Sequence, residues 1–441
     1  MNIPGNIRVR RLARRLFVSA LFFPTLYAIV ALVASFTLVR WDATAPTTLG
    51  LHIDAASAQS AMSALTSGML AFTGFVTSVV LLIVQFGTSE FSPRLVRWFN
   101  SDRTLNLALS TFIATFLFAL VTTAQIDTSS GAPPPTRSVI AATVLALLSV
   151  LMFLLLIART QNGLRVAKVV QGVDSAARQV FDTVYPSTRP GAESEGTTVE
   201  PQDAPVQTLY SGDVGAVLAT LDQDALVALA HQRGALIRMR RAVGDHIPAN
   251  APLLDVYGPT KLPEARLRRC VILDDERTID FDPAFAFRVL VDIAIKALSP
   301  AVNDPTTAVQ SIDRIEDLLR YAAAKHLSAG AVADRSGTLR LVYPTPTWDD
   351  LVELALDEIR QFGTGQYQIA RRLRAMLDAL LDDLPERRRP ALRRQLALLD
   401  DAVAAAYPLS QRADALVADS QGIGMARGAA SPGKGKGPGD R

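Results

Sequence analysis

Cysteine, histidine and net charge are all scarce in this sequence of 441 residues. The one cysteine, Cys270, excludes an intrachain disulfide and fits a reducing compartment, and the apolar run after it is typical of a small buried side chain. The four histidines lack the HxxE or HExxH spacing of a zinc site, and no glycine-rich phosphate loop follows a predicted strand. We therefore predict no catalytic residue, no metal site and no cofactor.

The net charge of +3 is too small to indicate a nucleic-acid partner, and the basic residues do not alternate with aromatic ones. Hydrophobic residues make up 49% of the chain, which is too apolar for an ordinary soluble protein and too polar for one that is all membrane. The long apolar runs fall in the first 160 residues, and the charged residues crowd into the rest. This division predicts a transmembrane domain over 1–160.

Four stretches are long enough to cross a membrane, since a helical span needs about 20 mostly apolar residues. None of the four contains Lys, Arg, Asp or Glu; they are residues 16–39, 62–86, 105–126 and 138–158. We expect the first to be retained rather than cleaved as a signal peptide, because its apolar stretch is too long. The lack of ionisable groups argues against a proton pump or charge-coupled transporter working as a monomer.

Basic residues flank the spans unevenly. They precede the first span, lie between the second and third, and follow the fourth, whereas the two opposite loops hold only Arg40 and Arg137. The positive-inside rule then predicts a multi-pass protein whose termini and middle loop are all cytoplasmic.

The second span carries small and hydroxyl-bearing residues at helical spacing, namely Ser67, Ala71, Gly74 and Ser78, with threonines alongside. Small residues let helices approach closely, and hydroxyl groups can also face water. Two interpretations of this helix face therefore stay open, close helix packing and a pore lining, and packing is favoured. The third span has fewer hydroxyl groups, and the leucine-rich fourth span is predicted to face lipid.

Beyond the spans, three segments follow in order. Apolar residues at helical spacing predict a helical extension over 160–185 that acts as a rod. Residues 186–205, rich in Ser, Thr, Gly, Glu and Pro, predict a flexible linker. Short apolar runs between Gly and Pro predict a small β subdomain over 206–280, with a helix near 222–231 and strands at 235–239 and 252–257.

Helical periodicity returns over 281–407 and predicts a bundle. The Asp-Pro pairs at 282–283 and 304–305 each supply a capping residue and a first-turn proline, and Thr347 with Asp350 fits a capping box. The Gly- and Lys-containing end predicts a disordered tail over 408–441. The fold class is therefore mostly α: four transmembrane helices followed by a cytoplasmic region with a small β subdomain and an α-helical bundle.

The connection between the first two bundle helices is rich in polar side chains. One hypothesis is a ligand or ion pocket, or a subunit contact, formed by Asp292, Ser299, Asn303, Asp304, Thr306, Thr307 and Asp313. The favoured alternative is a tight turn held by its own Asn and Asp side chains together with an N-cap. A second acidic group at 274–282 lacks the spacing of a calcium loop and predicts solvated hairpin charges.

The middle loop predicts a short helix along the membrane surface. Ser92 can cap it, Pro93 fits its first turn, and Arg94 and Arg97 are available to lipid phosphates. A sharper alternative is that the loop docks on the bundle, with Arg94 paired to the carboxylate of Asp292 or Asp313.

Three motifs stand out: FSPRL at 91–95, LVDIA at 290–294 and the long, specific run ALSPAVNDPTTA at 297–308. Together they resemble a family of bacterial predicted membrane proteins classed as a domain of unknown function. The resemblance extends from the first span to about Tyr407. It implies membrane helices followed by a cytoplasmic region, in a bacterial inner membrane, and no known activity.

Uncharged spans, a hydroxyl-bearing face and a helical link together predict an oligomeric channel or passive transport protein with a cytoplasmic regulatory domain. The alternative is a membrane-anchored sensor or scaffold without conduction, and an enzyme is the least supported class. The expected partners are the lipid bilayer and further copies of the chain. The sequence does not identify a small ligand or ion.

Overall fold

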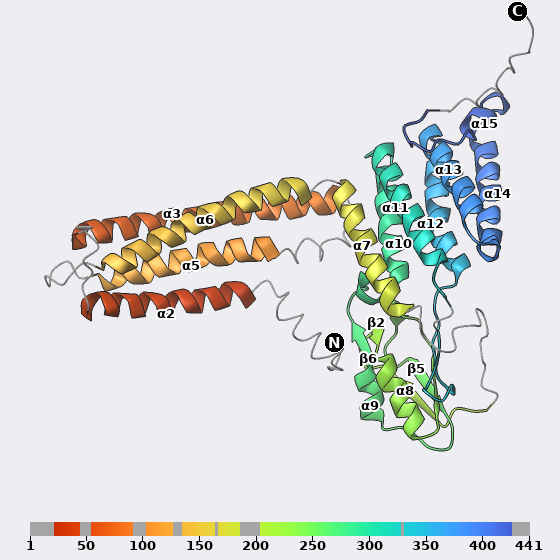
Figure 1. Cartoon of the computed structure of the whole chain (residues 1–441), viewed down its shortest axis with the longest axis horizontal. Helices are drawn as coiled ribbons and strands as arrows, with labels where there is room; N and C mark the ends of the chain where they lie inside the picture. Colours follow the sequence, from red (N-terminus) through yellow and green to blue (C-terminus); the bar gives the residue numbers. More distant parts are fainter. Residues whose placement is uncertain are drawn as a thin grey trace, which may run out of the picture. The chain divides into compact units, whose positions relative to one another are not determined.

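The computed structural model describes residues 22–44, 54–90, 103–126, 135–163, 166–185, 203–327 and 330–425. It divides the chain into two compact units, one up to Arg165 and the other from Val166 onward. We call these the membrane unit and the C-terminal unit and describe each by itself (Figure 1).

Four described helices of the membrane unit are long and apolar enough to cross a bilayer. They are α2 (Phe22–Thr44), α3 (Ala55–Glu90), α5 (Arg103–Gln125) and α6 (Thr136–Gly163). Half of the apolar window of α5 is buried, against 11–17% for the other three, and α5 packs against each of them. α5 is therefore the central helix of the unit. The predicted plan of four membrane helices is confirmed.

Hydroxyl pairs join these helices. Ser35 Oγ of α2 lies 3.0 Å from Thr122 Oγ1 of α5, and Thr115 Oγ1 of α5 lies 2.8 Å from Ser149 Oγ of α6. All four side chains are buried. Two hydroxyl groups of the third span, those of Thr115 and Thr122, thus pair across helix contacts within one copy.

A carboxylate beyond the predicted end of the first span caps α6. Asp42, near the end of α2, is 2% exposed. Its carboxylate accepts hydrogen bonds from the backbone N–H groups of Arg137 and Ser138 at 3.1 and 3.0 Å, and from the Ser138 hydroxyl at 2.9 Å. These donors are ones that the first turn of a helix leaves without partners, so Asp42 ties α2 to α6.

The C-terminal unit combines two small sheets with a helical bundle (Figure 1). The five-stranded sheet has the order β1-β5-β3-β8-β7, with β1 at Gln207–Tyr210, β5 at Pro252–Tyr257, β3 at Leu236–Met239, β8 at Leu339–Val342 and β7 at Ala331–Ala333. The three-stranded sheet has the order β4-β2-β6, with β4 at His246–Ile247, β2 at Ala216–Leu221 and β6 at Val271–Asp274. The β3–β8 pair is parallel, and the other pairs are antiparallel.

The stretch predicted as a helical bundle over 281–407 also contains two strands, β7 and β8. These strands have three and four residues, too few to show a period of two, and they form by pairing with each other and with β3. Two further helices, α8 (Gln223–Gln232) and α9 (Glu264–Cys270), accompany the sheets.

The bundle contains α10 (Pro283–Ala297), α11 (Pro305–Ala323), α12 (Trp348–Gly363), α13 (Tyr367–Asp383) and α14 (Arg389–Ala406), with short 3-10 turns η2 (Ile279–Phe281) and η3 (Glu386–Arg388). The expected caps are present. Asp282 accepts from the Phe285 N–H at 3.1 Å, Asp304 accepts from the Thr307 N–H at 3.1 Å, and Thr347 with Asp350 forms a complete capping box.

The helix α7 (Val166–Val184) packs against α10 and α11 as part of this bundle. Its Asp182 accepts hydrogen bonds from Tyr321 at 2.5 Å and Lys325 at 2.6 Å, near the end of α11, and its Arg178 lies over the Tyr321 ring. The two helices therefore run parallel. Because each has 19 residues, their first turns lie at the same end of the bundle.

The predicted disordered tail over 408–441 is ordered as far as residue 425. α15 (Leu409–Ala415) is followed by residues 416–425, which we call the C-terminal strap. The strap is held mainly by hydrogen bonds between side chains and its backbone rather than by an apolar run, so its composition resembled that of a disordered segment. Residues 426–441, and residues 186–202 of the predicted linker, lie outside the described ranges.

Gly244 lies between β3 and β4 and packs against side chains at the start of α10. Its φ is +94°, and a Cβ added there would lie 2.3 Å from Asp282 Oδ2 and 2.5 Å from Arg277 Nε. These two side chains form an ion pair at 2.6 Å, with Asp282 almost fully buried. Burial raises the pKa of the Asp282 carboxyl, although Arg277 opposes the shift.

Asp334 anchors the β7–β8 turn to α8. Its Oδ1 accepts hydrogen bonds from Ser336 and from the Thr338 N–H, and its Oδ2 lies 2.8 Å from both Arg340 Nε and His231 Nδ1. The bonds from Ser336, Arg340 and His231, in that order, hold the pKa of Asp334 well below its ordinary value.

We expect this depression to make the stability of the C-terminal unit sensitive to acid. A lowered folded-state pKa contributes stability that is complete above the unfolded pKa of about 4 and is lost as the pH falls below it. Asp334→Asn should therefore destabilise the unit at pH ~7, and the difference from the wild type should shrink as the pH falls towards ~3. Chemical denaturation at several pH values measures this difference, and a constant difference would contradict the assignment.

Candidate functional site

The polar connection between α10 and α11 forms a tight turn. The Ser299 carbonyl accepts from the N–H groups of Val302 and Asn303 at 3.1 and 2.8 Å, and the Asp304 N–H donates to the Ala297 carbonyl at 2.8 Å. Asn303 has a φ of +47°, in the left-handed region that asparagine tolerates. Asp304 also accepts from the Thr307 hydroxyl at 2.5 Å. These contacts are those of a turn closed by an N-cap.

The turn between α12 and α13 lies against this connection. Gln366 Nε2 donates to Asn303 Oδ1 at 3.4 Å, while Gln366 Oε1 is buried without a hydrogen-bond partner. A Cβ at Gly363 would lie 2.4 Å from Ile369 Cγ2 and 3.1 Å from Leu298 Cδ1, so glycine permits the close approach. The two turns therefore form one end of the bundle.

The other candidate residues have different surroundings. Asp292 is paired with Arg288, which also forms a bidentate ion pair with Glu358 of α12. Asp313 is paired with an arginine of α13, and Thr306 is exposed. The structure thus brings Asn303, Asp304 and Thr307 together in the turn and gives each outer carboxylate an arginine partner.

The middle-loop candidates Ser92, Pro93, Arg94 and Arg97 lie outside the described residues. Both the surface helix and the docking of Arg94 on Asp292 or Asp313 therefore stay predictions. Each of these carboxylates already has an arginine partner, Arg288 for Asp292 and Arg372 for Asp313.

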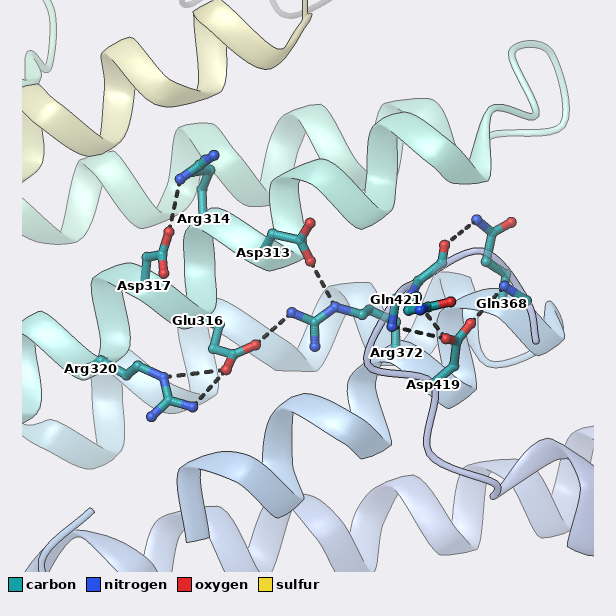
Figure 2. Close-up of polar contacts among 11 residues, drawn as sticks. Asp313, Arg314, Glu316, Asp317, Arg320, Gln368, Arg372, Asp419 and Gln421 are labelled. Atoms are coloured by element: carbon teal, nitrogen blue, oxygen red, sulfur yellow. Dashed lines mark hydrogen bonds and ion pairs between the residues drawn. The ribbon is translucent and has the colours of Figure 1, made fainter. Parts of the chain in front are cut away.

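Four charged residues connect α11 with α13, and we call them the α11–α13 charge network: Asp313, Glu316, Arg320 and Arg372 (Figure 2). Arg372 is 7% exposed, and its Nε and Nη2 donate to Asp313 at 2.7 Å and Glu316 at 2.5 Å. The second oxygen of Glu316 accepts from Arg320 Nη2 at 2.8 Å. Burial alone would lower the pKa of Arg372, but the bonds to Glu316 and Asp313 outweigh it and raise the pKa above its ordinary value.

The C-terminal strap folds around a buried carboxylate. Asp419 is 1% exposed and accepts hydrogen bonds from the N–H groups of Gln421, Gly422 and Gly424 at 3.0, 3.1 and 2.7 Å. The cluster of N–H donors lets one carboxylate fix the path of the strap (Figure 2).

Side chains of α13 hold the strap from the other side. Gln368 donates to the Gly422 carbonyl, and Arg371 donates to the Gly424 carbonyl, both at 2.6 Å. Gly422 has a φ of +66°, and a Cβ there would lie 2.5 Å from Val309 Cγ1 of α11 and 3.4 Å from Arg372 Cδ. The strap therefore lies across α11 and α13 beside the charge network.

These contacts join three segments of the C-terminal unit. Within the described ranges, no group of three or more His, Cys, Asp or Glu side chains could hold a metal ion. Arg372 donates to two carboxylates through Nε and Nη2, and Asp419 accepts from three backbone N–H groups. Together they fix the relative positions of α11, α13 and the strap.

Sequence reasoning missed Arg372, Glu316 and Asp419. One signal was available, because Arg372 falls on the same helical stripe as the buried Ile369, Leu373 and Met376, where an arginine needs a partner. Asp419 gave no signal, since its partners are backbone groups of the residues that follow it.

Comparison with known proteins gives the family. Residues 18–379 match the family described as "Predicted membrane protein (DUF2254)". The chain belongs to this family. It is also 27% identical over 354 residues to uncharacterized proteins of Mycobacterium bovis and of Mycobacterium tuberculosis strain H37Rv, covering 78% of this chain and 67% of each relative. No solved structure matches the chain. The family agrees with the four apolar helices in making this a membrane protein.

Proposed function

We propose that the protein associates with further copies of itself through α3 and forms a passive path for small solutes or ions between the copies. The proposal is carried by one observation, the exposed small-residue face of α3. The proposed function involves no catalytic step, and the C-terminal unit has a regulatory role in it.

The two faces of α3 differ sharply. Ala58, Met62, Met69 and Val76 are buried within the membrane unit. Ser67, Ala71, Gly74 and Ser78 are exposed, and the turn of about 100° per residue places them on the opposite side of the helix. A Cβ added at Gly74 would meet no atom within 4 Å. Small residues four apart are the pattern by which membrane helices pack closely.

Larger side chains border this face. Leu70 is 60% exposed and Phe75 is 61% exposed, so the small residues form a shallow line between apolar ridges. A path inside one copy is not supported, because Phe112 and Phe118 fill the contact between α5 and its neighbours and are at most 1% exposed. This favours a path between copies, lined by the hydroxyl groups of α3.

Cysteine cross-linking in membranes tests the association. In a Cys270→Ala background, Gly74→Cys and Ser67→Cys should form a disulfide-linked dimer on mild oxidation. Leu147→Cys, on α6 and 66% exposed, is the matched control and should not. Equal cross-linking at all three positions, or none at Gly74 and Ser67, would argue against association through α3.

The second candidate is a membrane-anchored sensor or scaffold without conduction. One observation favours it. Thr66, Thr73, Thr77 and Ser78 each donate their hydroxyl hydrogen to the carbonyl four residues earlier in α3, at 2.7–3.0 Å. Hydroxyl groups satisfied in this way need no water-filled path, which favours a contact with lipid or another helix.

We further propose that the protein spans a bacterial inner membrane with both termini in the cytoplasm. The uneven distribution of arginine supports this orientation. A reporter that is active only in the periplasm should therefore be active when fused near Pro46 or Pro134 and inactive when fused after Arg159. The reverse pattern would overturn the orientation without touching the association through α3.

A further inference from the structure

One end of the helical bundle exposes several large apolar side chains. In the described part of the C-terminal unit, nine such side chains are exposed, and five of them lie at this end. They are Val302 (40% exposed), Phe362 (57%), Leu409 (81%), Ile423 (62%) and Met425 (56%). We call these five residues the apolar end. Clustered exposed apolar side chains mark a surface that contacts something other than water.

Separate segments build the apolar end. Val302 belongs to the α10–α11 turn, Phe362 to the last turn of α12, and Ile423 and Met425 to the C-terminal strap. Leu409 begins α15. This helix is held at the same end by the tilted ring contact of Tyr367 and Tyr407, with centroids 4.7 Å apart, and by the 3.1 Å bond from Tyr367 to Gln411. The charge network and Asp419 hold these segments in place.

The apolar end is also the end of the bundle closest in sequence to the membrane. The first turn of α7 lies there, because α7 and α11 run parallel and have equal length. Val166 begins α7 only seven residues after Arg159, the last residue of the fourth candidate span. In the sequence, the sheets follow the opposite, C-terminal end of α7.

Two arginines near the apolar end add positive charge. Arg371 donates to the carbonyls of Asp414 and Gly424, and Arg412 donates to the carbonyl of Tyr407. Neither has a carboxylate partner among the described residues. Arg371 also lies over the Tyr367 ring. Because these partners are neutral groups, both guanidinium groups can attract a lipid phosphate.

We propose that the apolar end rests in the headgroup layer of the bilayer, with Phe362, Leu409 and Ile423 at the acyl boundary and the two arginines near lipid phosphates. Apolar anchors flanked by basic groups are the chemistry of interfacial membrane contact. The contact would hold the C-terminal unit against the membrane surface, whether or not the protein conducts.

The test uses the full chain in lipid nanodiscs of phosphatidylcholine and phosphatidylglycerol, with one copy per disc. In the Cys270→Ala background, an environment-sensitive fluorophore is placed in turn at Phe362→Cys and Ile423→Cys. The matched controls are Val214→Cys and Leu398→Cys, which are also exposed apolar positions and lie elsewhere in the unit. Lipids with a quencher near the headgroup report contact with the bilayer.

We expect the labels at residues 362 and 423 to be quenched several-fold more strongly than those at residues 214 and 398. Equal quenching at all four positions would overturn the proposal. A second result would also overturn the proposal: no quenching with one copy per disc, together with energy transfer between copies at higher loading. That result would assign the apolar end to contact with a second copy of the chain. Neither result depends on cross-linking through α3.

Discussion

Gly244→Ala is expected to destabilise the C-terminal unit by about 3 kcal/mol. A side chain in a left-handed backbone conformation costs roughly 1–2 kcal/mol, and a lost helix cap costs about 1 kcal/mol. Both costs apply, because Gly244 has a positive φ and its added Cβ would displace Asp282, which caps α10. The substitution therefore acts on the joint between the sheets and the bundle.

Gly337→Ala is the matched control. Gly337 also has a positive φ, of +82°, but a Cβ there would meet no atom within 4 Å. It should show the backbone cost alone, roughly 1–2 kcal/mol. Replacing Trp41 and Trp98 by Phe leaves Trp348 as the fluorescent reporter of the C-terminal unit during denaturation. Equal destabilisation by the two substitutions would show that the contact with Asp282 and Arg277 contributes nothing.

Arg372→Met is expected to destabilise the same unit by about 2–3 kcal/mol. Removing one partner of a fully buried ion pair costs roughly 3–5 kcal/mol because a charge is left unpaired. The cost is smaller here because Asp313 is 45% exposed and Glu316 keeps Arg320 as a partner. Methionine retains the apolar packing of the arginine stem, so the loss reports mainly the charge network.

Arg374→Met is the control on the same helix. Arg374 pairs with Asp378 and Asp400, whose side chains are 42% and 45% exposed, so the change should cost less than about 1 kcal/mol. The Trp348 fluorescence measurement serves both variants. Similar losses for Arg372→Met and Arg374→Met would mean that burial of the network adds no stability.

Much of the fold follows from local rules in the sequence. The Asp-Pro pairs begin α10 and α11 as predicted, and β5 spans the six residues expected for it, because caps, prolines and apolar runs act over a few positions. The strands β7 and β8 escaped prediction because their existence depends on β3, which lies about a hundred residues earlier in the chain.

The candidate site was predicted only in part. The turn at Asn303 and its cap at Asp304 are local, and the sequence indicates them. Asp292 pairs locally with Arg288, four residues earlier on α10. The partner of Asp313 is not local, since Arg372 reaches it across 59 positions. The strap around Asp419 consists of backbone donors, which every sequence possesses, so only the folded chain shows that they converge.

Flux across a bilayer shows whether copies that associate through α3 form a passive path. The purified full chain is reconstituted into liposomes loaded with K⁺, Cl⁻ or a small neutral dye, and release is followed without an energy source. We expect release to rise more steeply than linearly with protein density, to fall several-fold on Gly74→Leu and to be unchanged by Leu147→Ile on α6. Conduction is contradicted if none of the three probes is released from liposomes in which Gly74→Cys forms the cross-linked dimer. The non-conducting scaffold would then be the function.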